Sequence, residues 1–138
     1  MFIDTSPAAQ EQTWPPEPVS VPHTRHFLRE ALNLWGLQAV GDEAAVVLSE
    51  LATNAVIHAG TDFTVRLSPS GTQKLHLSVT DGSTVMPQWA TDPHATDGRG
   101  LRLIDALSTE WGVILSGVKG KTVWALLTAD PMIDKDFP

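Results

Sequence analysis

Polar side chains form a stripe on an otherwise apolar segment near the middle of the chain. Glu50, Asn54 and His58 are spaced four residues apart, so a helix would place them on one face. The neighbouring residues are almost all Ala, Val, Leu and Ile, which predicts that most of this helix is buried. A carboxylate beside an amide oxygen offers the hard oxygen ligands that Mg²⁺ takes in proteins. Glu50 and Asn54 are therefore a candidate magnesium pair, although a solvated helix face is the plainer interpretation.

An acidic residue follows a segment that has the alternation of a buried strand. Asp81 and Gly82 stand where that strand is expected to end. A carboxylate at such a place can accept a hydrogen bond from an amino group, for example that of adenine. Asp-Gly is also a common turn dipeptide, so this signal is weak when it is taken alone.

Two glycines flank an arginine at the expected start of a short helix. Gly98, Arg99 and Gly100 lead into Leu101, an apolar residue of that helix. Glycines allow a close approach of the backbone, and free N–H groups at a helix N-terminus face any anion placed there. A plain loop-to-helix junction has the same appearance, so this signal is also weak by itself.

The elements that must position these groups are helices and strands arranged in blocks. In chain order we expect a helix over residues 20–35, a helix over residues 42–59, a hairpin over residues 63–79, a short helix from residue 98 and a hairpin over residues 111–127. Ser20 and Asp42 are the expected N-caps of the first two helices. This order indicates an α+β two-layer sandwich, with a mixed, mostly antiparallel sheet and the helices on one face.

One domain over residues 20–128 accounts for this pattern. Residues 1–19 are expected to be an N-terminal extension, and residues 129–138 a C-terminal tail. The prolines of the extension forbid a helix there. Trp14 would attach a short edge strand to the domain, and a loosely held tail is an equally good interpretation.

Composition and charge exclude several classes of protein. The chain has 138 residues without a single cysteine, so it carries neither a disulfide framework nor a thiolate metal site. Its net charge of -7 argues against nucleic acid or an anionic membrane as the main partner. The start of the chain lacks the apolar core of a signal peptide, and no apolar run is long enough to span a bilayer. We therefore expect a cytoplasmic protein.

The order and spacing of these segments resemble a known family. The stretches that carry the resemblance are VPHTRHFLREAL, SELATNAVIHAG, VTDGS, DGRGLRLID and GKTVWALL, in that order over residues 20–128. They look like the ATPase superfamily of gyrases, chaperones, histidine kinases and mismatch-repair proteins, in its anti-sigma-factor serine-kinase branch. The resemblance implies a Bergerat-type ATP-binding fold with ATP and Mg²⁺ as cofactors. Ser83 and Val85 stand where many relatives have glycine.

The resemblance also implies a role for individual residues. Glu50 matches the general base, and Asn54 matches the Mg²⁺ ligand, with Glu50 joining the metal through water. Asp81 matches the residue that recognises the adenine amino group, and the segment 83–97 matches the nucleotide lid. The implied nucleotide-binding set is Asn54, Asp81, Gly82, Gly98, Arg99, Gly100, Leu101 and Thr122.

Three functions remain open at the level of sequence. The first is a serine/threonine-protein kinase that uses Mg-ATP to phosphorylate an antagonist protein, an anti-anti-sigma factor, and that sequesters a sigma factor in transcription regulation. The second is a module of the same fold that regulates by protein contact without catalysis. The third is a metal hydrolase without a nucleotide, built on Glu50, Asn54 and His58, which ranks low because the helix has no second histidine.

The resemblance further implies partners. They are the sigma factor and its antagonist, with no nucleic acid or membrane, and a homodimer is common in this branch. Arg25 and Arg29 lie one turn apart on the first helix, where they would meet an acidic partner or simply face solvent.

Overall fold

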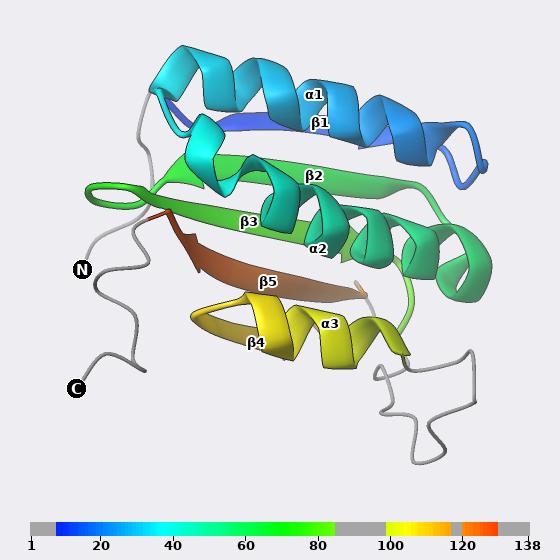
Figure 1. Cartoon of the computed structure of the whole chain (residues 1–138). Helices are drawn as coiled ribbons and strands as arrows, with labels where there is room; N and C mark the ends of the chain where they lie inside the picture. Colours follow the sequence, from blue (N-terminus) through cyan, green and yellow to red (C-terminus); the bar gives the residue numbers. More distant parts are fainter. Residues whose placement is uncertain (1–7, 85–98, 117–119, 130–138) are drawn as a thin grey trace.

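The helices of this protein cover one face of a sheet and leave the other face open (Figure 1). This arrangement comes from a computed structural model that describes residues 8–84, 99–116 and 120–129. It confirms the predicted α+β two-layer sandwich. The elements in chain order are β1 Gln10–Trp14, α1 Ser20–Trp35, η1 Gln38–Val40, α2 Gly41–Asn54, η2 Ala55–Ala59, β2 Phe63–Pro69, β3 Lys74–Asp81, α3 Arg99–Leu107, β4 Glu110–Leu115 and β5 Lys121–Thr128.

The strand order of the sheet differs from the order of the strands along the chain. The sheet has five strands in the order β1-β2-β3-β5-β4. All pairings between these described strands are antiparallel, so the mixed sheet allowed by the sequence is an antiparallel one here. After α3 the chain forms β4 at the sheet edge and returns through β5 beside β3. The first residue of β5, Lys121, is thereby paired with the last residue of β3, Asp81.

Trp14 anchors β1 at the opposite edge of the sheet. Its ring is 5.4 Å from that of Phe27 in α1 and 6.2 Å from that of Phe63 in β2, between ring centroids. Trp14 is 7% exposed, and β1 pairs with β2 along its whole length. Of the two interpretations of this segment, the edge strand is therefore the correct one for residues 10–14.

The helices attach to the sheet through the apolar stripes that the sequence shows. The fully buried side chains of the two longer helices include Leu28 and Leu32 in α1 and Leu48 in α2, which belong to the same core as Leu77 of β3. Burial of each such side chain stabilises the fold by about 1.5–3 kcal/mol before the entropy cost. This packing keeps α2 in a fixed position over the sheet.

The helix starts differ from the predicted caps. Ser20 is the first residue of α1 rather than its N-cap, and its hydroxyl donates to the carbonyl of Pro15 at 2.8 Å. Asp42 lies inside the first turn of α2. Its negative charge interacts favourably with the positive end of the helix dipole there, and its side chain does not cap a free N–H. Gly36 ends α1 in the left-handed conformation, which agrees with the predicted end of this helix at residue 35.

The second predicted helix changes its geometry directly after Asn54. Residues Ala55–Ala59 form a turn of π-helix, which Gly60 closes at φ 64°. Single π turns inside helices are often found at functional sites. The π turn directly after Asn54 therefore favours a functional site at this end of α2.

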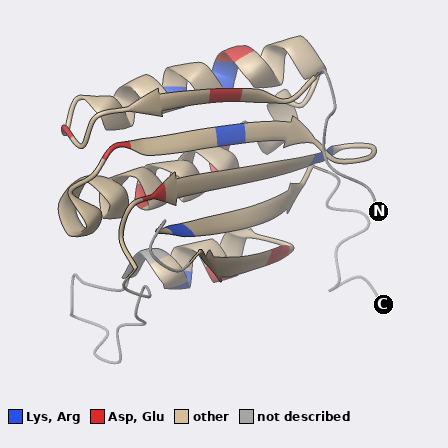
Figure 2. Cartoon of the chain, turned by 180° about the vertical axis from the view of Figure 1, so that it is seen from behind, with Lys and Arg blue, Asp and Glu red and all other residues tan. Residues whose placement is uncertain are grey.

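Charged side chains are spread thinly over this scaffold. Figure 2 shows the open face of the sheet, and the described Lys and Arg residues lie on α1, β2, β3, α3 and β5 without a dense cluster. Over the same described residues, no helix is both long and apolar enough to cross a membrane.

Candidate functional site

Several predicted site residues lie at one end of the sandwich. Figure 1 places the end of α2 and η2, the end of β3, the start of α3 and the start of β5 at the same end of the molecule. The strand register agrees, because Asp81 is opposite Phe63 on one side and Lys121 on the other. Segments that are far apart in the sequence are thus collected into one candidate site.

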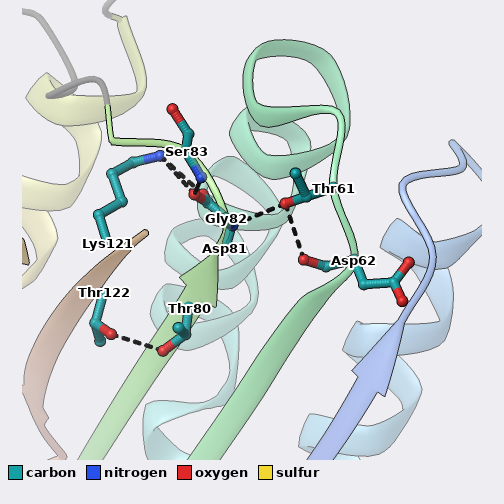
Figure 3. A network of polar contacts seen from close by, with 8 residues as sticks. All are labelled: Thr61, Asp62, Thr80, Asp81, Gly82, Ser83, Lys121 and Thr122. Atoms are coloured by element: carbon teal, nitrogen blue, oxygen red, sulfur yellow. Dashed lines mark hydrogen bonds and ion pairs between the residues drawn. The ribbon is translucent and has the colours of Figure 1, made fainter. Parts of the chain in front are cut away.

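Asp81 is held by donors on both sides of its carboxylate. The backbone N–H of Ser83 donates to Oδ1 at 2.8 Å (Figure 3). The ammonium of Lys121 donates to Oδ1 at 2.9 Å and to Oδ2 at 2.8 Å. The two side chains are 5% and 7% exposed, so this is a buried ion pair.

Strand alternation explains why a lysine is buried here. Lys121 belongs to the side of β5 that faces the helices, together with the core residues Val123, Ala125 and Leu127. A buried ammonium is very unfavourable unless a counter-charge and hydrogen bonds compensate for the lost water. Asp81 supplies both. Removal of one partner of such a pair costs about 3–5 kcal/mol, because the other charge is left uncompensated.

The loop after η2 is tied to the end of β3. The hydroxyl of Thr61 accepts from the N–H of Gly82 at 2.8 Å and donates to the carbonyl of Asp62 at 3.0 Å (Figure 3). A Cβ at Gly82 would lie 3.0 Å from the methyl carbon of Thr61, which leaves little room for a side chain. The Asp81-Gly82 turn is therefore joined to the loop that follows η2.

Gly120 lets β5 begin directly beside Asp81. Its φ is 110°, and an ideal Cβ built there would be 1.9 Å from the carbonyl oxygen of Asp81. No other residue fits this position without moving the backbone. The glycine therefore sets the close approach that places Lys121 against Asp81.

Thr122 and Asp81 lie on opposite faces of the sheet. Its hydroxyl is 2.7 Å from that of Thr80, on the face of the sheet opposite to the Asp81–Lys121 pair. The residue of β5 that contacts Asp81 is Lys121 instead.

Glu50 and Asn54 are half-buried on α2, and Asn54 is its last residue. An amide oxygen and a carboxylate are groups of the kind that Mg²⁺ takes as ligands, directly or through water. Within the described residues, no group of three or more His, Cys, Asp or Glu side chains could hold a metal ion. His58 is exposed in η2 and enters no such group.

The predicted phosphate-side segment is described only in part. Arg99 and Gly100 open α3, and Leu101 is buried in the core, so Leu101 can offer a ligand its backbone only. Gly98 and the predicted lid beyond Thr84 lie outside the described residues.

Sequence reasoning missed Lys121, Thr61 and Gly120. A signal for Lys121 was present, because it has the same alternation phase as the apolar residues of its strand. That phase marks a lysine on the buried face, and such a lysine needs an acidic partner. Nothing in the sequence named Asp81 as that partner before the strand order was known.

Comparison with known proteins finds a matching family model and a similar fold. The family model described as histidine kinase-like ATPase domain matches residues 14–127. Among solved structures, the RsbU and RsbW domains of Rv1364c from Mycobacterium tuberculosis have a similar fold, with a TM-score of 0.66 and 19% sequence identity. The match covers 87% of this chain and 31% of that chain, so the solved protein extends well beyond the shared part. No curated protein matches the chain.

Proposed function

Because the chain belongs to the histidine kinase-like ATPase domain family, we propose that it binds ATP and Mg²⁺ at the end of the sandwich where Asp81, Asn54 and the start of α3 lie. The observation that carries this proposal is the collection of these groups at one end by the antiparallel pairing of β3 with β2 and β5. Membership of an ATPase domain family implies ATP binding.

Each group has a distinct task at this site. Asp81 and Gly82 lie at the base end, where Ser83 and Lys121 leave about one acceptor position of the carboxylate for an exocyclic amino group. Asn54 supplies an amide oxygen to Mg²⁺, with Glu50 acting through water. The phosphates face the backbone of Arg99, Gly100 and Leu101 at the start of α3, where free N–H groups favour an anion. Thr122 does not enter the proposal, because its hydroxyl lies on the open face.

We propose further that the domain is a serine kinase, like the anti-sigma-factor kinases that it resembles. Bound Mg-ATP supplies the γ-phosphoryl group, and phosphoryl transfer needs mainly positioning and charge compensation from the protein. Glu50, one turn before Asn54, would accept the proton of the attacking serine hydroxyl on a small antagonist protein. The other proposed partner is a sigma factor, which the domain would sequester. A homodimer of the domain stays a prediction, which sedimentation velocity would check.

A second candidate function is a regulatory module that binds partners with weak catalysis or none. Two observations favour it. Lys121 already engages the carboxylate of Asp81, and Ser83 occupies a position where many relatives have a flexible glycine. Both features oppose tight binding of the base.

Calorimetry with ATP and ADP, each with and without Mg²⁺, tests the shared part of both functions. We expect heat of binding with ATP and a marked loss of affinity for Asn54→Ala when Mg²⁺ is present. Absence of binding at millimolar ATP would overturn the nucleotide-binding function. Phosphate transfer from labelled ATP to a candidate antagonist then separates the kinase from the module.

A further inference from the structure

We propose that Lys121 is a specificity-determining residue that competes with the nucleotide base for Asp81. This inference rests on the proposed function, because it concerns the base end of the same site. Its consequence is that the wild-type site barely distinguishes a purine nucleotide with a 6-amino group from one without it.

Most acceptor positions of the Asp81 carboxylate are already occupied within the protein. A carboxylate has about four lone-pair positions. Ser83 N–H and Lys121 occupy Oδ1, and Lys121 also occupies Oδ2, all at 2.8–2.9 Å. Roughly one position on Oδ2 is left for a ligand. The amino group of a bound base would therefore donate to a carboxylate whose charge Lys121 already neutralises.

The ammonium of Lys121 is a stronger donor to Asp81 than the amino group of a nucleotide base. Both donors would bond to an ionised acceptor, but only the ammonium of Lys121 adds a positive charge that attracts the carboxylate as well. Because the Lys121 and Asp81 side chains are 7% and 5% exposed, water screens their attraction little. An uncharged base amino group cannot displace the ammonium from such a partner, because the ammonium would remain buried without a counter-charge.

The backbone holds the Cα of Lys121 opposite Asp81. Lys121 is the first residue of β5, and its Cα is paired with that of Asp81 across the sheet. Gly120, immediately before it, packs against the carbonyl of Asp81. The Cα of Lys121 is therefore held opposite Asp81, and the ammonium can leave the pair only by rotation of its side chain.

A matched pair of nucleotides measures the competition directly. Purine riboside triphosphate carries hydrogen in place of the 6-amino group of ATP and is otherwise the same ligand. Calorimetry with both nucleotides would be run on the wild type, on Lys121→Met, which keeps length and removes the charge, and on Lys74→Met. Lys74 is an exposed lysine at the other end of β3, so it controls for the loss of one positive charge.

The expected result is a change in discrimination and not only in affinity. Wild type and Lys74→Met should bind the two nucleotides within about twofold of each other. In Lys121→Met the freed carboxylate accepts the amino group, and ATP should be favoured at least about tenfold, as for a hydrogen bond to a charged acceptor. If Lys121→Met does not fold, Lys121→Gln takes its place, and the wild-type ratio alone still decides.

The outcomes separate this inference from the proposed function. A tenfold preference of the wild type for ATP would overturn the inference and leave the proposed function intact. Equal binding of both nucleotides by the folded Lys121 variant would overturn it as well. Binding of neither nucleotide by wild type, Lys74→Met and Lys121→Met would overturn the proposed function, and the inference with it.

Discussion

Asp81 and Lys121 depend on each other within the folded chain before any ligand arrives. Each is the buried counter-charge of the other, and their distance of 2.8 Å is that of a strong charge-assisted hydrogen bond. A substitution at either residue therefore changes stability as well as binding. Measurements of nucleotide affinity on such variants need a stability measurement beside them.

Asp81→Asn should lower the free energy of unfolding by about 3–5 kcal/mol, because it leaves the ammonium of Lys121 buried and uncompensated. Urea unfolding followed by circular dichroism measures this. The double variant Asp81→Asn/Lys121→Met carries no buried charge at the pair and should recover most of the loss. Equal stability of Asp81→Asn and wild type would mean that the pair contributes nothing to the fold.

Glu50→Ala should separate catalysis from structure. Glu50 is half-buried, and loss of a general base typically slows a reaction by about 10²–10⁴-fold. We expect phosphoryl transfer to a candidate antagonist to fall by that factor, with melting temperature and ATP affinity nearly unchanged. Glu43→Ala, in the exposed first turn of the same helix, is the matched control and should keep full activity. Unchanged transfer by the Glu50 variant would exclude it from the mechanism.

At the scale of elements, β3 and β5 approach each other closely at Gly120, within the described part of the candidate site. Gly120 and Gly71 both have positive φ, at 110° and 69°. A Cβ at Gly120 would collide with the carbonyl of Asp81, whereas a Cβ at Gly71 meets nothing within 4 Å. The two glycines thus separate the effect of backbone strain from the effect of a clash.

Gly71→Ala should cost about 1 kcal/mol of stability, the usual strain of a left-handed residue. Gly120→Ala should cost clearly more, because the backbone of β5 must shift away from Asp81. It should also weaken ATP binding, which Gly71→Ala should not. Chemical unfolding together with calorimetry checks both effects, and equal losses in the two variants would show that the close contact does not matter.

Helix α1 carries the two arginines that the sequence offered as a docking face, and the structure distinguishes them. Arg25 is half-buried and donates to the hydroxyl of Ser49 in α2 at 3.1 Å, while Arg29 is exposed. Arg25 therefore helps to join the helices, next to Glu50. Arg29 is the cleaner probe of an acidic partner.

Arg29→Glu should reduce capture of a candidate sigma factor or antagonist in a pull-down and leave stability and ATP affinity unchanged, if α1 is a docking face. Arg25→Glu should reduce stability in addition, since it breaks the contact with Ser49. Capture that is unaffected by Arg29→Glu would exclude this arginine from the interface.

At the scale of the whole molecule, ligand binding and folding are linked. A ligand that binds only the folded state stabilises it by about 2.7 kcal/mol at one hundred times its dissociation constant. The melting temperature should therefore rise by several degrees with saturating Mg-ATP. Asn54→Ala should lose the part of this shift that depends on Mg²⁺, and a wild-type melting curve that does not respond to Mg-ATP would contradict the proposed site.

Local patterns in the sequence determined most of the elements. Helical periodicity over residues 20–35 predicted α1, and alternation predicted β2, β3 and β5. These signals are readable because helix and strand periods depend on near neighbours in the chain. The order of the motifs also identified the family, and with it the candidate roles of Asp81 and Asn54.

The tertiary structure alone decided which side chains meet. Insertion of β5 between β3 and β4 placed Lys121, rather than Thr122, against Asp81. Neighbouring residues of a strand point to opposite faces, so a difference of one position moves a side chain from the buried site to the open face. Register and strand order follow from packing between distant segments, which no local period encodes. For that reason the sequence could supply the carboxylate of Asp81 but not the ion pair that occupies it.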